Sequence, residues 1–202
     1  MTRKDVRPRH RLGAATRTDA ILHAAAELFA RSPYPLVSVA DIAQAADASE
    51  ALVFRYFGTK ADLYAQVVAR GARQLADAEL EAIAALHPNT PVQAKLRAAL
   101  VIYLDHIASH PKTWAANNGG TGEPPEAVLA RAAARQDHID ALTRLLAPNT
   151  SARHRYSLWG YLGFLDAACL AWVRAGCPAS DRGPIIEAAL GSLEGALGDW
   201  SA

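Results

Sequence analysis

Several side chains between Ser49 and Lys60 are of types that bind nucleic acids. The guanidinium of Arg55 can donate two parallel hydrogen bonds to the edge of one guanine base. Tyr56 and Lys60 carry a hydroxyl and an ammonium group, which suit the phosphate oxygens of a nucleic acid backbone. Residue types in this order indicate that the segment reads double-stranded DNA, provided that local structure turns them outward.

Capping residues divide this segment into a helix, a turn and a second helix. Ser38 can accept an amide hydrogen bond from the following turn, so a helix is expected over residues 39–46. Asp47 stands at the turn, where a left-handed backbone is usual and Asp tolerates it better than most non-glycine residues. Ser49 caps a second helix over residues 50–56, whose short length and outward polar residues are typical of a recognition helix.

The same segment resembles the DNA-binding signature of the TetR family of transcriptional regulators. The matching residues, in register with the family pattern, are Ile42, Ala43, Ala46, Ser49, Tyr56, Phe57, Lys60 and Leu63. This resemblance is specific over about residues 16–65 and implies an all-α protein with an N-terminal helix-turn-helix domain. We expect a basic arm at 1–15, the helix-turn-helix domain at 16–63, and a helical ligand-binding and dimerisation domain at 64–202.

Three residues depart from the family pattern: Asp47 replaces Gly, Leu52 replaces Thr, and Phe54 replaces Tyr. The two latter changes remove hydroxyls, which leaves Phe54 only apolar contacts such as a thymine methyl group. Glu50 adds a negative charge that repels phosphate unless it accepts from a cytosine amino group. The predicted DNA-binding set is Arg17, Ser38, Ser49, Glu50, Leu52, Phe54, Arg55, Tyr56 and Lys60.

Composition and charge favour a helical protein with a basic N-terminus. The chain has 202 residues, 51% of them hydrophobic, and apolar residues recur at three and four positions, so about nine helices are expected. Residues 1–17 hold six basic residues and one acidic residue, although the net charge of the chain is only +1. This arm is either a solubilising tail or a segment that contacts DNA phosphates or a minor groove.

Membrane and secretory classes are disfavoured by the sequence. It has neither an apolar run of roughly 20 residues nor the apolar core of a signal peptide, which predicts a cytoplasmic protein without a membrane partner. Its two cysteines do not make a disulfide framework.

Aromatic and polar residues of the larger domain form a candidate pocket for a small-molecule effector. The proposed lining is Tyr103, His106, Trp114, Asn117, Asn118, His138, Trp159 and Phe164. The alternative is that most of these residues belong to the core or to an interface. His106 and His110 have the spacing of two metal ligands but lack a third, so no metal or other cofactor is predicted. The absence of catalytic motifs argues against an enzyme.

Small residues recur on one side of the last two expected helices. They are Gly160, Gly163, Ala188, Gly191, Gly195 and Gly198, and a stripe of this kind lets another helix approach closely. We expect the two helices to pair with those of a second copy in a two-fold dimer. Close packing within one chain is the alternative.

The combined prediction is a homodimeric DNA-binding repressor that a small molecule releases from a palindromic operator. A long helix over about residues 60–86 would connect the DNA-reading unit to the ligand-binding domain and transmit the displacement. Two alternatives remain open. One is a helical small-molecule-binding protein or enzyme that has lost DNA binding, and the other is a TetR-like activator or a repressor without an inducer.

Overall fold

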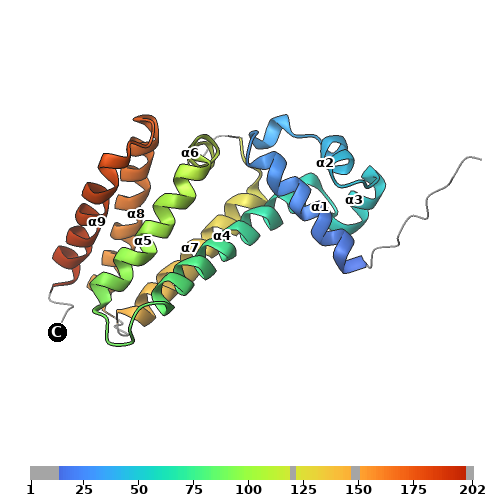
Figure 1. Ribbon diagram of the computed structural model, residues 1–202. Helices are drawn as coiled ribbons and strands as arrows, with labels where there is room; N and C mark the ends of the chain where they lie inside the picture. Colours follow the sequence, from blue (N-terminus) through green and yellow to red (C-terminus); the bar gives the residue numbers. More distant parts are fainter. Residues whose placement is uncertain (1–13, 119–121, 147–150, 199–202) are drawn as a thin grey trace, which may run out of the picture.

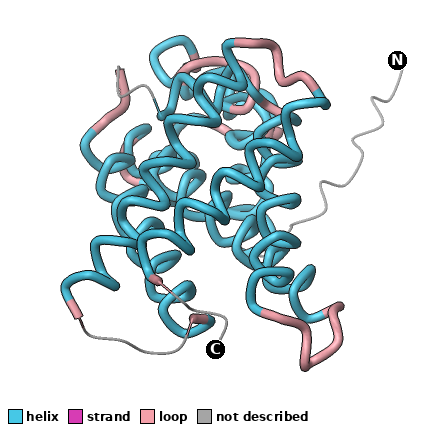
Figure 2. The backbone as a smooth tube through the Cα atoms, turned by 90° about the vertical axis from the view of Figure 1, so that its left-hand side faces the viewer, coloured by secondary structure: helices cyan, strands magenta, loops and turns pink. Residues whose placement is uncertain are grey.

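The computed structural model describes residues 14–118, 122–146 and 151–198. These residues form nine α-helices and two short 3₁₀ turns, and they contain no strand (Figure 2). The prediction of an all-α chain is therefore confirmed. Figure 1 shows a small N-terminal group of helices at one end and a larger helical domain at the other. Within the described residues, no helix is long and apolar enough to cross a membrane.

The small group of helices, called the head below, contains three helices before the long α4. They are α1 (Ala14–Phe29), α2 (Val39–Ala45) and α3 (Glu50–Phe57), with a 3₁₀ turn η1 (Tyr34–Leu36) between the first two. Their boundaries follow from the caps that the sequence predicts. The Ser38 hydroxyl accepts a hydrogen bond from the Asp41 amide at 3.0 Å, and the Asp41 carboxylate accepts one from the Ser38 amide at 2.9 Å.

The turn between α2 and α3 also has the predicted geometry. Asp47 adopts φ 47°, in the left-handed region that a sharp reversal between helices requires. The Ser49 hydroxyl then accepts a hydrogen bond from the Leu52 amide at 3.2 Å and begins α3. The turn and the cap together fix the orientation of α3 within the head.

The head is held together by an apolar core. Its buried members are Ile21, Ala25, Phe29, Val37, Ile42, Ala43, Val53, Phe57, Leu63, Tyr64 and Ala127. Ala127 comes from the larger domain, so the head packs directly on that domain as well as being joined to it by the chain.

The helix α4 (Lys60–Ala84) runs from the head along the larger domain (Figure 1). Its 25 residues give a length of about 38 Å at 1.5 Å per residue. Beside it lie α5 (Val92–Ser109) and α7 (Pro125–Leu145), while the short α6 (Pro111–Asn118) lies near the head. A side chain near the end of α4 can therefore face both neighbouring helices.

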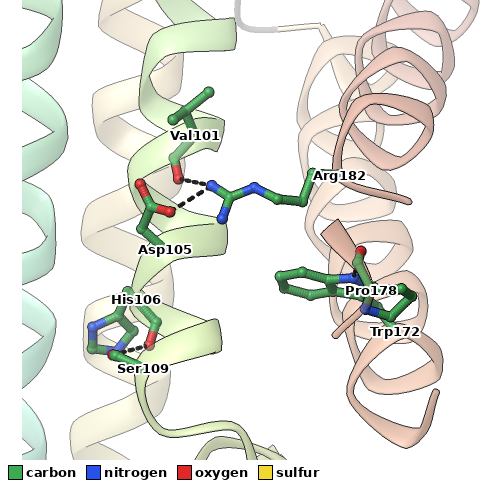
Figure 3. A network of polar contacts seen from close by, with 7 residues as sticks. All are labelled: Val101, Asp105, His106, Ser109, Trp172, Pro178 and Arg182. Atoms are coloured by element: carbon green, nitrogen blue, oxygen red, sulfur yellow. Dashed lines mark hydrogen bonds and ion pairs between the residues drawn. The ribbon is translucent and has the colours of Figure 1, made fainter. Parts of the chain in front are cut away.

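Two further helices, α8 (Ala152–Arg174) and α9 (Arg182–Leu197), complete the larger domain on the side away from the head (Figure 1). Arg182 at the start of α9 ties this pair to α5, because its guanidinium reaches the Asp105 carboxylate at 2.5 Å (Figure 3). The Trp172 indole donates to the carbonyl of Pro178 at 3.0 Å and holds the connection between the two helices. These contacts fix the position of α9.

The predicted helix boundaries are correct to within two or three residues, and the largest difference is at the end of the chain. The small-residue stripe was expected to reach Gly198 on the last helix, but α9 ends at Leu197. Gly198 adopts φ 86° and caps the helix, as glycine often does at this position. The placement of Gly198 on the small-residue stripe of the last helix is therefore wrong.

Candidate DNA interface and ligand-binding core

The helix α3 turns three of the predicted DNA-binding side chains outward. Glu50, Phe54 and Arg55 are exposed, whereas Val53 and Phe57 are buried in the core of the head. Phe54 is 47% exposed, which is unusual for a large apolar side chain and agrees with the prediction that it offers an apolar contact. The Arg55 guanidinium makes no hydrogen bond or ion pair with any described residue, so its donors are available to a partner.

Ser38 and Lys60 have partners inside the protein; the sequence indicated the cap at Ser38 but not the contact of Lys60. The Ser38 hydroxyl donates to the Asp41 carboxylate at 2.6 Å, so its proton is used within the cap. The Lys60 ammonium donates to the carbonyl of Tyr34 at 2.7 Å and lies 4.1 Å from the centre of the Tyr34 ring. Burial holds the pKa of Lys60 below its usual value. Both residues therefore stabilise the head, and neither group points freely toward phosphate.

The remaining predicted contacts of the head are partly covered. Arg17, Leu52 and Tyr56 are half-buried, and Tyr56 packs against the core of the head. Ser49 is exposed, although its hydroxyl oxygen is already occupied by the cap of α3. The basic residues of the N-terminal arm before residue 14 lie outside the described residues.

In the larger domain, Glu79 of α4 is buried among side chains of three other helices. It is 7% exposed, and its carboxylate lies 3.7 Å from Nδ1 of His138 in α7. Burial raises the pKa of Glu79 to about 7. The Glu79 charge also acts on the pKa values of Tyr103 in α5 and Tyr161 in α8, which are raised chiefly by burial. The carboxylate therefore faces the centre of the domain.

Charged and sulfur-containing groups act on the same tyrosine, Tyr103, as this carboxylate does. Arg135 of α7 forms an ion pair with Asp166 of α8, and the Arg135 guanidinium lies 5.9 Å from the centre of the Trp159 ring. Cys169 of α8 is fully buried, and burial raises the pKa of its thiol to about 12. A thiol with such a pKa stays neutral and packs as a small apolar group.

Four members of the predicted pocket lie around this centre. Tyr103, Trp114 and Phe164 pack against the main core cluster of the larger domain, and His138 contacts Glu79. The rings of Tyr103 and Trp114 meet edge to face, with their centroids 6.5 Å apart. The structure thus brings aromatic groups from α5, α6 and α8 into one core, and Tyr103 of this group lies within electrostatic reach of Glu79.

The other members of the predicted pocket do not join it. His106 is exposed on α5, and Trp159 is 40% exposed on α8. Their assignment to the pocket stays a prediction, because both side chains are open to solvent in the structure. The side chains of Asn117 and Asn118 lie outside the described residues. Among the described residues, no three metal-binding side chains gather into a site.

Glu79 was missing from the predicted pocket, although the sequence carries a signal for it. Leu75, Glu79 and Ile83 follow one another at four-residue spacing, which places the acid within the inward stripe of α4. Leu80, directly beside it, is 58% exposed. Glu79 thus lies inward on α4 although it is charged, while its apolar neighbour Leu80 lies outward. This reversal of the usual pattern is the signal for a buried acid.

The small residues of α8 and α9 lie on one exposed surface, which we call the outer face. Gly160, Gly163, Gly191 and Gly195 are exposed, and a Cβ added at any of them would meet no atom within 4 Å. Ala188 is exposed as well. The alternative that these residues pack closely within one chain is therefore wrong. A hollow of about 360 Å³ on this face is lined by residues that include Arg153, Tyr156, Gly160 and Ser192.

A group of hydrogen bonds, which we call the joint, connects the larger domain to the head. The Tyr64 hydroxyl of α4 donates to the Glu123 carboxylate at 2.6 Å, and Arg131 of α7 donates to the same carboxylate at 2.7 and 3.0 Å. Thr113 of α6 donates to the carbonyl of Ala30 at 2.6 Å, directly after α1. Although burial pushes the pKa of Glu123 upward, the hydrogen bonds from Arg131 and Tyr64 hold it below its usual value.

Comparison with known proteins confirms the resemblance inferred from the helix-turn-helix. Residues 21–67 match the family model described as bacterial regulatory proteins, tetR family. This match covers α2, α3 and parts of α1 and α4. No curated protein matches the sequence of the chain.

Solved structures share the overall fold. A tetR-family transcriptional regulator from Streptomyces coelicolor superposes with a TM-score of 0.73 and 23% identity, over 92% of this chain and 80% of that one. A transcriptional regulator from Pseudomonas aeruginosa PAO1 gives 0.74 and 14%, over 94% and 95% of the two chains. The regulator FadR from Bacillus subtilis, solved in complex with stearoyl-CoA, gives 0.69 and 16%, over 86% and 98%. At identities this low, the superpositions show the fold alone.

Proposed function

Because residues 21–67 form a tetR-family helix-turn-helix within the fold of that family's solved members, we propose that the chain is a sequence-specific DNA-binding regulator of transcription. It acts as a homodimeric repressor that leaves a palindromic operator when a small molecule binds the larger domain. The observation that supports this most directly is the outward face of α3, where Glu50, Phe54 and Arg55 have no partner among the described residues.

Each of these three side chains suits a different feature of the major groove. Arg55 fits the O6 and N7 acceptors of guanine, Phe54 fits a thymine methyl group, and Glu50 can accept from the amino group of cytosine. The two capped ends and the left-handed Asp47 hold α3 in one orientation, which keeps the side chains in register with the base pairs. Two copies related by a two-fold axis would read two half-sites about one helical turn or a multiple apart.

The test is fluorescence anisotropy with a duplex from upstream of the gene and a scrambled duplex, at low and physiological salt. Wild type should keep its affinity for the first duplex when salt rises, because base contacts survive the screening that weakens phosphate contacts. If the native fragment does not bind, selection from random DNA supplies an operator or shows that the protein has none.

Arg55→Ala should weaken binding to the operator by roughly ten- to hundred-fold, which corresponds to about 1–3 kcal/mol for one bidentate base contact. The matched control is Arg174→Ala, which removes the same charge from an exposed position of α8. Equal losses on operator and scrambled DNA would show that Arg55 contacts the backbone only.

The outer face supports the homodimer. Each glycine in a helix lowers helix stability by about 1 kcal/mol relative to Ala. The glycines of the outer face have open space around them, so no close contact within one chain offsets this loss. Close approach of the same helices from a second copy would offset it. The exposed Tyr156 and Trp159 border this face and would be buried by such pairing.

Gly191→Leu should convert the dimer to a monomer, as measured by sedimentation velocity. Leucine also favours a helix over glycine, so loss of the dimer could not be attributed to unfolding of α9. The control is Gly71→Leu on α4, where an added Cβ likewise meets no atom within 4 Å. An intact Gly191→Leu dimer would show that the subunits pair elsewhere.

Release from DNA is supported by the connection between the centre of the larger domain and the head. The helix α4 carries Glu79 near one end and the joint residue Tyr64 near the other. A ligand that binds one arrangement of α4 and α7 more tightly shifts the population toward that arrangement and displaces both heads of the dimer. The B. subtilis relative solved with stearoyl-CoA supports a role for a small molecule in proteins of this fold.

A further inference from the structure

The buried carboxylate of Glu79 has no partner that balances its charge. It lies 3.7 Å from His138 Nδ1, which is longer than a hydrogen bond, and it accepts no hydrogen bond from any described residue. Glu79 as a whole is 93% buried, because only 7% of its surface is exposed to solvent. A carboxylate removed from water in this way is costly unless a cation or several donors meet it.

The cations near Glu79 are not available to it. Arg135 is paired with Asp166 on the neighbouring α8. The pKa of His138 is held below its usual value by burial and by the charge of Arg135, so its imidazole stays neutral at physiological pH. The cluster of Glu79, Arg135, His138 and Asp166 therefore carries one net negative charge when the acid is ionised.

Two tyrosines from different helices face this negative charge, and further aromatic side chains continue from them into the core of the larger domain. Tyr103 of α5 and Tyr161 of α8 lie within its electrostatic reach, and neither hydroxyl hydrogen-bonds to a described residue. Trp114 stands edge to face with Tyr103, and Phe164 packs on the same core cluster. Aromatic rings near a carboxylate attract organic cations, because the face of each ring is electronegative and the carboxylate is negatively charged, so both favour a positive ligand.

We infer that the effector of this domain is an organic cation, an amine or quaternary ammonium ion with apolar substituents, whose charge is balanced by Glu79. This inference rests on the proposed function, which places the effector in the larger domain. An anionic effector would bring a second negative charge to the cluster, while the guanidinium that could receive it is already engaged. A neutral effector would leave the carboxylate without a counter-charge.

The experiment compares probes of similar size and opposite charge on the full-length protein at pH 7.5. Tetraphenylphosphonium is matched with tetraphenylborate, and the smaller benzyltrimethylammonium with phenylacetate. Binding is followed by isothermal titration calorimetry, and release of the operator by anisotropy in the same buffer. We expect a cation to bind at least tenfold more tightly than its anionic twin.

Glu79→Gln keeps the shape of the side chain and removes its charge, and it should lower cation affinity at least tenfold. The matched control is Glu81→Gln, an exposed acid on the same helix, which should leave the affinity unchanged. The inference is overturned if no cation binds at millimolar concentration, if the anionic twins or stearoyl-CoA bind as tightly, or if Glu79→Gln retains cation affinity.

The two proposals fail in different ways. If a cation binds in a way that depends on Glu79 but the protein stays on its operator, the cationic effector class is supported and ligand-released repression is contradicted. If an anion releases the protein from DNA and Glu79→Gln does not change this release, the proposed regulatory function is supported and the cationic effector is contradicted.

Discussion

In the head, polar side chains at the helix ends pair with near neighbours in the sequence, whereas in the core of the larger domain the Glu79 carboxylate and Nε2 of His154 have no hydrogen-bond partner among the described residues. Ser38, Ser49 and Thr59 each accept an amide hydrogen bond three residues further on. All three polar or charged residues that are buried among the described residues, Glu79, His154 and Ser157, belong to the larger domain.

This difference separates two tasks. An apolar core with satisfied caps favours one geometry of the head, as reading bases in register requires. Buried polar groups without full hydrogen bonding lower the stability of the larger domain, and a ligand that supplies their partners recovers it. The predictions below test this contrast between a fixed head and a ligand-dependent larger domain.

The largest effect is expected from a cavity in the core of the head. Ile42→Ala should lower the free energy of unfolding by about 2–5 kcal/mol, because Ile42 is fully buried and the surrounding helices cannot close the space. Urea denaturation followed by circular dichroism gives the value. Leu36→Ala, at an exposed position of η1, should change it by less than about 0.5 kcal/mol. Similar losses at both positions would contradict a tightly packed head.

The next effect concerns the buried acid of the larger domain. The pKa of Glu79 is raised from 4.5 to about 7, so the folded state holds its proton while the unfolded state has already released it. Relative to Glu79→Gln, the stability of wild type is greatest below pH 4.5, falls as pH rises through this window, and is lowest above pH 7. The total loss is about 3 kcal/mol.

Urea denaturation at pH steps from 4 to 8 measures this difference, with Glu81→Gln as the exposed control. A constant difference between wild type and Glu79→Gln across the series would mean that Glu79 is hydrated in solution. The contrast between the two regions would then rest on packing alone.

The smallest effect is expected at the joint. Tyr64→Phe removes the hydroxyl that donates to Glu123, and it should lower the free energy of unfolding by about 1 kcal/mol. Affinity for the operator should change little, while a higher effector concentration should be needed to release DNA. Ser109→Ala, which removes a hydroxyl from an exposed position of α5, serves as control. Unchanged release in Tyr64→Phe would show that the signal passes through other contacts.

The fold and the reading helix were predictable because the interactions that specify them are local. The caps at Ser38 and Ser49 and the left-handed Asp47 act over two to four residues, so their sequence positions alone determine where α2 and α3 begin and turn. The recurrence of apolar residues at three and four positions predicted helices for the same reason. Helix ends were less certain, as at Gly198, because several residues can terminate a helix.

Residue type alone could not tell which of the predicted pocket residues face the core of the larger domain. Tyr103, Trp114, His138 and Phe164 lie at or near the centre of the larger domain, but His106 and Trp159 are exposed. A histidine or tryptophan is compatible with either face of a helix, and only the packing of α5 and α8 against their neighbours decides which. Glu79 could have been found from its place in the inward stripe of α4.

The sequence by itself determined the helices, the turn at Asp47, the outward groups of α3 and the stripe of small residues on α8 and α9. Tertiary structure alone decided that Lys60 pairs with Tyr34, 26 residues away, and that Glu79 lies against His138. It also decided that the glycine stripe faces open space. Helix caps and periodicity depend on neighbours within one or two turns, whereas the burial of a charge depends on which distant helices surround it.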